Sequence, residues 1–175
     1  LRPDLSMFES CNEAWKRSIE KYESLEDGNP KAVMGGHRNF LENAVELFYR
    51  AGHRRKAARV FLQLREEYTT GPHSGDYSMT VRSFVHDRIK EELASSIGDK
   101  DAAEQILMSL REAYFRYAVH QDDVATGAEN WAEEIYRIYQ QQTGSPEQYR
   151  MGLPSLGRLR YIAFIGFLND AFYPE

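Results

Sequence analysis

Two stretches decide the fold of this chain: AGHRRKAARVFLQLREEY at residues 51–68 and IGDKDAAEQILMSLREAY at residues 97–114. They align without a gap at an offset of 46 residues, and the identical pairs are Gly52/Gly98, Ala57/Ala103, Leu64/Leu110, Arg65/Arg111, Glu66/Glu112 and Tyr68/Tyr114. Each stretch has a glycine between two expected helices, then a small residue early in the second helix, then large residues. A small residue at that place lets two helix axes approach closely, and the larger residues fill the groove beyond it. The pair therefore predicts a repeated helical hairpin.

Helical spacing of apolar residues continues through the rest of the chain. The first expected helix follows a candidate cap at Asp4 and ends before Gly28 and Pro30, with the apolar stripe Leu5, Phe8, Cys11, Trp15, Ile19, Tyr22 and Leu25. Further helices are expected at about 37–51, 54–68, 79–96, 100–119, 127–142 and 155–170. The segment from Thr69 to Ser78 is the clearest loop. TGSP at residues 143–146 indicates a helix stop followed by a short helical turn.

No window shows the alternation of a β-strand, so the predicted class is all-α with about seven helices. We expect one domain over 1–175, built as an irregular stack of antiparallel hairpins at about 4–51, 37–68, 79–119 and 127–170. Since the chain begins at Leu1, we also expect a trimmed, processed or partial chain, and no signal peptide is visible.

Residues 38–71 resemble the tetratricopeptide repeat family of helical hairpins. The positions that carry the resemblance are Leu41, Ala44 and Phe48 in the first helix and Ala57 and Phe61 in the second. The chain departs from the family pattern at Val45, Leu64 and Thr69. The resemblance covers about 75 residues clearly, and it implies a right-handed stack that binds a peptide or partner protein on its concave face.

In this family the first helix of each hairpin lines the concave face. The resemblance therefore places there Asn39, Glu42, Asn43, Glu46, Tyr49 and Arg50. Asparagine and arginine side chains are suited to holding an extended peptide backbone or a terminal carboxylate. The leading prediction is a non-catalytic protein–protein interaction scaffold.

A basic cluster follows this helix: His53, Arg54, Arg55, Lys56 and Arg59. Cations are disfavoured at a helix start by the helix dipole, so the cluster is either a binding patch for phosphate or an acidic partner, or an exposed turn neutralised by neighbouring acids. The second reading is favoured. As an alternative function, Arg54, Arg55 and their neighbours would serve a nucleic-acid-associated or regulatory module. The net charge of -5 and the pI near 5.6 make nucleic acid an unlikely partner.

No catalytic, cofactor or metal site is expected. The chain has five histidines and one cysteine, without the spacing of a known ligand motif. Ser18 and Lys21 have the spacing of a penicillin-recognising nucleophile but none of its companion motifs. The adjacent acids Glu66–Glu67, Glu91–Glu92 and Glu133–Glu134 diverge around a helix and indicate solvated faces. An enzyme with a site assembled from scattered residues is a third alternative, and it would need a deep polar pocket.

The last expected helix is apolar on nearly every face. Its longest apolar run is YIAFIGFL at residues 161–168, which is too short for a membrane span. We expect helix 155–170 to pack across the end of the stack, or to mediate self-association or docking to another domain. Among single residues, Cys11 is expected to pack as a small hydrophobe, His37 to lie near a helix start, and His53 to lie in a hairpin turn.

Overall fold

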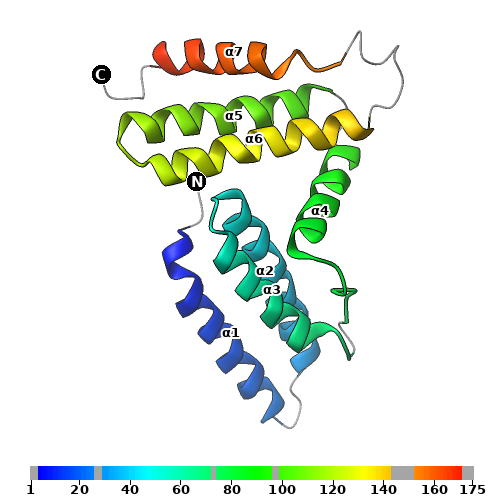
Figure 1. Cartoon of the computed structure of the whole chain (residues 1–175). Coiled ribbons are helices and arrows are strands. Elements are labelled where there is room, and N and C mark those ends of the chain that lie inside the picture. The colour runs from blue at the N-terminus through cyan, green and yellow to red at the C-terminus, as the bar shows by residue number, and fades with distance from the viewer. Residues whose placement is uncertain (1–3, 26–28, 72–73, 96–98, 143–151, 171–175) are drawn as a thin grey trace. The chain divides into compact units, whose positions relative to one another are not determined.

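The computed structural model describes residues 4–25, 29–71, 74–95, 99–142 and 152–170 (Figure 1). Within these ranges the chain forms helices and no strand, which confirms the predicted all-α class and the expected number of helices. In chain order the elements are the 3-10 helix η1 (Leu5–Met7), α1 (Phe8–Glu23), α2 (Pro30–Arg50), α3 (Arg54–Tyr68), α4 (Val81–Ser95), α5 (Asp99–Ala118), α6 (Asp122–Gln142) and α7 (Leu156–Leu168).

The ends of several helices follow from their sequence. Asp4 caps η1, since its carboxylate accepts a hydrogen bond from the Ser6 N–H at 2.9 Å. Hydrogen bonding to Ser6 also lowers the pKa of this exposed carboxyl. Between α2 and α3, Gly52 adopts φ +78°, a left-handed conformation that favours glycine. The predicted turn there is confirmed, and His53 forms the N-cap of α3.

The helices form two compact units. The first comprises Leu1–Tyr49 and His53–Val85, and the second comprises Arg50–Gly52 and His86–Glu175. The two helices that carry the sequence repeat, α3 and α5, therefore belong to different units. One domain over 1–175 and a tetratricopeptide-like stack of hairpins stay predictions.

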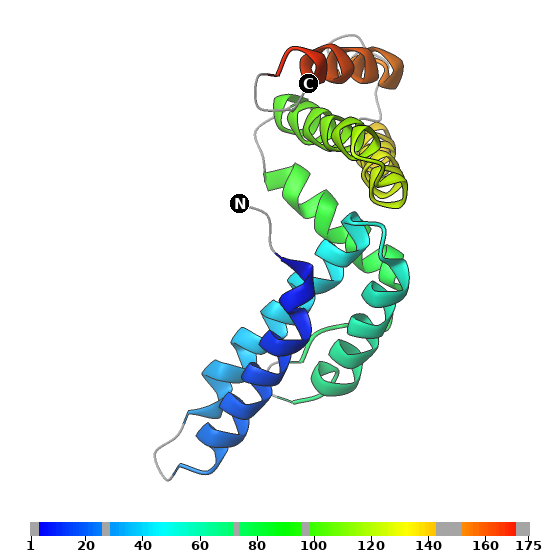
Figure 2. The same ribbon diagram turned by 90° about the vertical axis from the view of Figure 1, so that its left-hand side faces the viewer.

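In the first unit, α1, α2 and α3 lie side by side (Figures 1 and 2). Phe8 of α1 stacks on Phe40 at a ring-centroid distance of 5.5 Å and meets the edge of Phe48 at 5.3 Å. A second aromatic cluster joins Phe61 of α3 to Tyr77 and Phe84, with centroids 6.1 and 5.2 Å from that ring. These contacts, with the buried aliphatic side chains Leu41, Val45, Val60 and Leu64, form the core of the unit.

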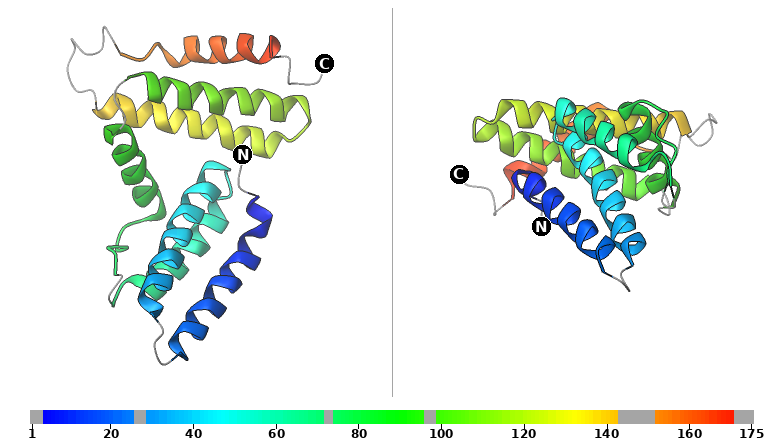
Figure 3. Two further views of the ribbon diagram at one scale, coloured as in Figure 1. Left: turned by 180° about the vertical axis from the view of Figure 1, so that it is seen from behind. Right: turned by 90° about the horizontal axis from the view of Figure 1, so that it is seen from below.

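In the second unit, α5 packs against both α6 and α7 (Figure 3). Its fully buried side chains include Ile106 and Leu110, and Ile135 and Ile138 of α6 and Leu159 of α7 are buried as well. Two aligned pairs of the repeat, Val60/Ile106 and Leu64/Leu110, are therefore buried to the same extent. Val60 and Leu64 in the first unit, and Ile106 and Leu110 in the second, are each at most 1% exposed.

The register of α1 differs from the expectation. Cys11, Tyr22 and Leu25 are exposed, whereas Phe8 and the polar Asn12 are its buried residues. Helix α1 also ends at Glu23, before the glycine and proline that were expected to stop it. Apolar spacing alone predicted the stripe, whereas hydrogen bonds to His37 of α2 and Gln63 of α3 hold Asn12 on the buried side.

Two helices begin earlier than their sequence predicted. Helix α2 begins at Pro30, not near residue 37, so His37 lies in the middle of the helix and is fully buried. Proline is favourable at a first helical position, since its missing N–H would have no helical partner there. Helix α6 begins at Asp122 instead of 127, and Asp122 and Asp123 give its first turn the negative charge that a helix N-terminus favours. The helix stop predicted at residues 143–146 and the short helical turn expected after it lie outside the described residues.

Candidate functional site

The residues of α2 that were predicted to bind a partner differ in their exposure to solvent. Asn39, Asn43 and Glu46 are spaced by four and three residues and share the outer side of α2, where both asparagines are exposed and Glu46 is half-buried. Glu42 is engaged elsewhere, since its carboxylate accepts a hydrogen bond from the Tyr77 hydroxyl at 2.5 Å. The solvent-facing part of the predicted site is therefore the Asn39–Asn43–Glu46 stripe.

Two further predicted residues are occupied by aromatic contacts. Tyr49 is buried, and the guanidinium of Arg54 lies 3.2 Å from the centroid of its ring. Arg50 belongs to the second unit, where its guanidinium lies 4.9 Å from the centroid of the Trp131 ring. Cations over aromatic faces are attracted by the ring quadrupole. Tyr49 is thus a packing residue in this structure, and its part in binding a partner stays a prediction.

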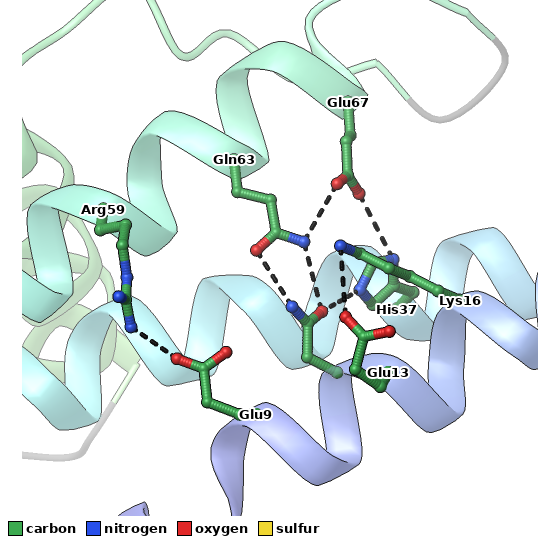
Figure 4. Close-up of polar contacts among 8 residues, drawn as sticks. Glu9, Glu13, Lys16, His37, Arg59, Gln63 and Glu67 are labelled. Atoms are coloured by element: carbon green, nitrogen blue, oxygen red, sulfur yellow. Dashed lines mark hydrogen bonds and ion pairs between the residues drawn. The ribbon is translucent and has the colours of Figure 1, made fainter.

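The basic cluster lies at the first turn of α3. His53, Arg54, Arg55 and Lys56 are exposed, no acidic residue lies in the first turn, and the N-cap side chain makes no capping hydrogen bond. Arg59 is exposed too, and its guanidinium is 2.5 Å from the Glu9 carboxylate of α1 (Figure 4). Neutralisation by a neighbouring acid is therefore observed for Arg59.

A buried polar network connects the three helices of the first unit (Figure 4). On α2, His37 makes 2.8 Å hydrogen bonds from Nε2 to the Asn12 Oδ1 atom of α1 and from Nδ1 to the Tyr68 hydroxyl of α3. The Asn12 and Gln63 amides bond to each other twice, at 3.1 and 3.2 Å. Gln63 Nε2 also donates to Glu67 at 3.0 Å. The sequence did not predict this network, since its residues are up to 56 positions apart (12 to 68) and match no motif.

Burial sets the protonation state of this network. It lowers the pKa of His37 to about 4, assisted by the positive charge of Lys16, because an imidazolium loses its hydration inside the protein. Burial likewise raises the pKa of Tyr68 to about 12, with a further contribution from the Glu67 charge against that of Arg38. At neutral pH both rings are therefore uncharged.

The second unit has a buried acid–imidazole pair. His86 Nε2 of α4 lies 2.5 Å from the Glu134 carboxylate of α6, and Glu134 is 5% exposed. Glu134 was expected on a solvated face; its burial corrects that reading, since His86 compensates the loss of hydration. A carboxylate orients an imidazole in this way both in catalytic sites and in structural pairs. The described residues contain no group of three acids, histidines or cysteines that could hold a metal ion.

Helix α7 presents its large apolar side chains in two directions. Phe164 lies at the border of the packed side, since its ring meets the edge of Tyr114 of α5 at 5.5 Å, whereas Leu159 and Ala163 are buried against the unit. The opposite side is open, with exposed fractions of 66% at Tyr161, 44% at Phe164, 38% at Ile165 and 60% at Leu168. These four residues follow the i, i+3, i+4, i+7 spacing of one helix face. They are called the α7 outer stripe below.

None of the helices in the described part of the chain has the length and apolar character needed to cross a membrane. Comparison with known proteins found no match: no family model, no curated protein and no solved structure matches this chain. The candidate sites are three surfaces and two buried clusters. The surfaces are the Asn39–Asn43–Glu46 stripe, the basic cluster and the α7 outer stripe, and the clusters are the His37 network and the His86–Glu134 pair.

Proposed function

We propose that this chain is a non-catalytic protein-interaction module of tetratricopeptide-like type, and that a partner protein binds it through the α7 outer stripe. The observation that supports the proposal is the exposure of four large apolar side chains on one side of a 13-residue helix. Exposed contiguous apolar surface marks interaction sites on folded proteins. The spacing of the stripe is the one by which an amphipathic helix is recognised in a groove or against another helix.

The Asn39–Asn43–Glu46 stripe of α2 is the second contact in this proposal. The family resemblance assigns the concave face to this helix, and the exposed asparagine amides both donate and accept hydrogen bonds, as an extended peptide backbone requires. The double substitution Asn39→Ala and Asn43→Ala is expected to weaken the binding of a partner whose extended segment contacts this stripe.

The α7 outer stripe can be tested with a matched pair of substitutions. In Ile165→Glu, a charge enters the stripe at a side chain that is 38% exposed; in Leu62→Glu, the same change is made on α3 at a side chain that is 43% exposed. For a partner that is purified and titrated against the full chain, Ile165→Glu should weaken binding at least about tenfold, since a buried unpaired charge costs more than 1.4 kcal/mol. Leu62→Glu should leave the affinity unchanged.

Light scattering on the same variants separates two kinds of partner. A dimer of the wild-type chain that dissociates in Ile165→Glu, but not in Leu62→Glu, would identify the partner as a second copy. A monomer throughout would indicate a different protein. Equal affinity of a bound partner for wild type and Ile165→Glu would contradict the use of α7.

The exposed cations His53, Arg54, Arg55 and Lys56 favour a second candidate function, a nucleic-acid-associated or regulatory module. Binding of this kind would depend steeply on salt, because each neutralised phosphate releases counterions. Arg55→Glu should then abolish binding to a labelled oligonucleotide at 50 mM salt. Binding that is absent in the wild-type chain at that salt concentration would remove this candidate.

A further inference from the structure

The polar network of the first unit has a defined direction of hydrogen bonding. The Glu67 carboxylate only accepts, so Gln63 must turn its NH₂ group towards it and its carbonyl oxygen towards Asn12. Asn12 then donates to that oxygen, and its own Oδ1 accepts from Gln63 and from His37. It follows that His37 bears its proton on Nε2, and that Nδ1 is the bare nitrogen that accepts from the Tyr68 hydroxyl.

A second proton on His37 would disturb this arrangement. It would sit on Nδ1, so the Tyr68 hydroxyl would have to turn from donor to acceptor. The charges that act on the ring are Lys16 on α1, which pairs with Glu13 at 3.7 Å, and Glu67 on α3, while Arg38 on α2 acts on the neighbouring Tyr68 hydroxyl. Glu67 is 3.7 Å from Nδ1 and favours a charged ring, while its 35% exposure weakens the attraction.

Among the helices of the first unit, α1 is the one whose packing such a disturbance would weaken most. Its buried residues in the described structure are Phe8 and Asn12, and Asn12 accepts directly from His37. By contrast, α2 and α3 bury at least five residues each. Elements with few buried contacts open at lower free energy than the rest of a protein. Loss of the network therefore weakens α1 before it weakens the α2–α3 hairpin.

We propose that α1 is a pH-gated arm: protonation of His37 releases α1 from α2 and α3 and uncovers the aromatic rings of Phe40 and Phe48. The two rings are covered by Phe8 in the closed state, and Trp15 also lies against Phe40 at 6.4 Å. Burial of the imidazole is consistent with this device, because it holds the pKa of His37 at about 4 in the closed state, below the ordinary value of 6.5. The open state binds the proton more tightly and is favoured as the pH falls.

Amide hydrogen exchange of the full chain tests the proposal. After correction for intrinsic exchange rates, the opening equilibrium of the α1 peptide 8–23 should rise by up to about tenfold per pH unit between 6.5 and 4, and by about 150-fold in total at pH 4. The peptide 122–142 of α6, in the other unit, is the internal control and should not follow this dependence. Constant protection of α1 between pH 7 and 4.5 would overturn the proposal. Equal loss from α1, α2 and α3 would also overturn it, because it would mean that the unit unfolds as a whole.

Two substitutions tie the effect to His37. His37→Gln retains an N–H donor but has no titratable ring, so the pH dependence of α1 should disappear. Asn12→Asp places a carboxylate 2.8 Å from Nε2 with nearly unchanged shape, which favours the charged ring and should abolish or reverse the acid release. If α1 in Asn12→Asp opened with falling pH as it does in the wild type, His37 would not be the gate.

Discussion

At the scale of a residue, the Tyr68 hydroxyl is hydrogen-bonded to the buried His37 ring. Its ionisation should lower the stability of the first unit at alkaline pH. In the folded chain the pKa of Tyr68 is raised from 10 to about 12, mainly by burial. Between these values the folded state retains a proton that the unfolded state has lost. The stabilisation is therefore complete below pH 10 and is lost as the pH rises through 12, by up to about 3 kcal/mol.

Tyr68→Phe should remove this alkaline loss. Near pH 7 the variant should be less stable by about 1–2 kcal/mol, because the buried His37 Nδ1 atom loses the hydroxyl that donates a hydrogen bond to it. Urea unfolding at pH 8, 10 and 11 measures both effects. Tyr22→Phe is the matched control, since Tyr22 is 42% exposed on α1. A Tyr68→Phe variant that lost as much stability as wild type above pH 10 would show that the linkage lies elsewhere.

At the scale of an element, Gly36 of α2 and Gly157 of α7 differ in the space around them. A Cβ at Gly36 of α2 would lie 2.7 Å from Cη2 of Trp15, so the missing side chain makes room for the indole of α1. A Cβ at Gly157 of α7 would have no neighbour within 4 Å. Glycine costs about 1 kcal/mol relative to alanine in a helix interior. At Gly36 that cost is offset by packing, and at Gly157 it is not.

The same substitution should therefore have opposite signs at the two positions. Gly157→Ala should stabilise the chain by about 0.5 kcal/mol through helix propensity, less than in a helix interior because Gly157 lies in the first turn of α7. Gly36→Ala should destabilise it by about 1–3 kcal/mol, the usual cost of overpacking, because a wedged indole cannot move as a flexible chain end can. Thermal and urea unfolding of both variants provide the measurement. Stabilisation by Gly36→Ala would mean that Trp15 is loosely held.

At the scale of the whole molecule, the repeat supplies equivalent core residues to the two units. Leu64 of α3 and Leu110 of α5 are both fully buried. Truncation of a buried leucine to alanine costs about 2–5 kcal/mol, depending on how far the cavity collapses. Leu64→Ala should reduce amide protection in α1, α2 and α3, and Leu110→Ala in α5, α6 and α7. Loss of protection in all six helices by either variant would instead indicate that the two units unfold as one.

The sequence by itself was sufficient for the presence of the helices and for much of the core, but not for the starts of α2 and α6. Period-3.6 spacing, Gly52 and the repeat predicted the all-α class, the bounds of α3 and the buried pair Leu64 and Leu110, because local propensity and binary pattern act within one helix. They also predicted an apolar last helix. Binding on α2 and α7 stays a prediction.

Only the tertiary structure decided which polar side chains are buried. Asn12 replaces Cys11 on the inner side of α1, His37 lies inside α2, and Glu134 pairs with His86. A polar residue can be buried only when distant residues satisfy its hydrogen bonds. Those partners are 25 and 48 positions away along the chain, and helical spacing contains no information about them.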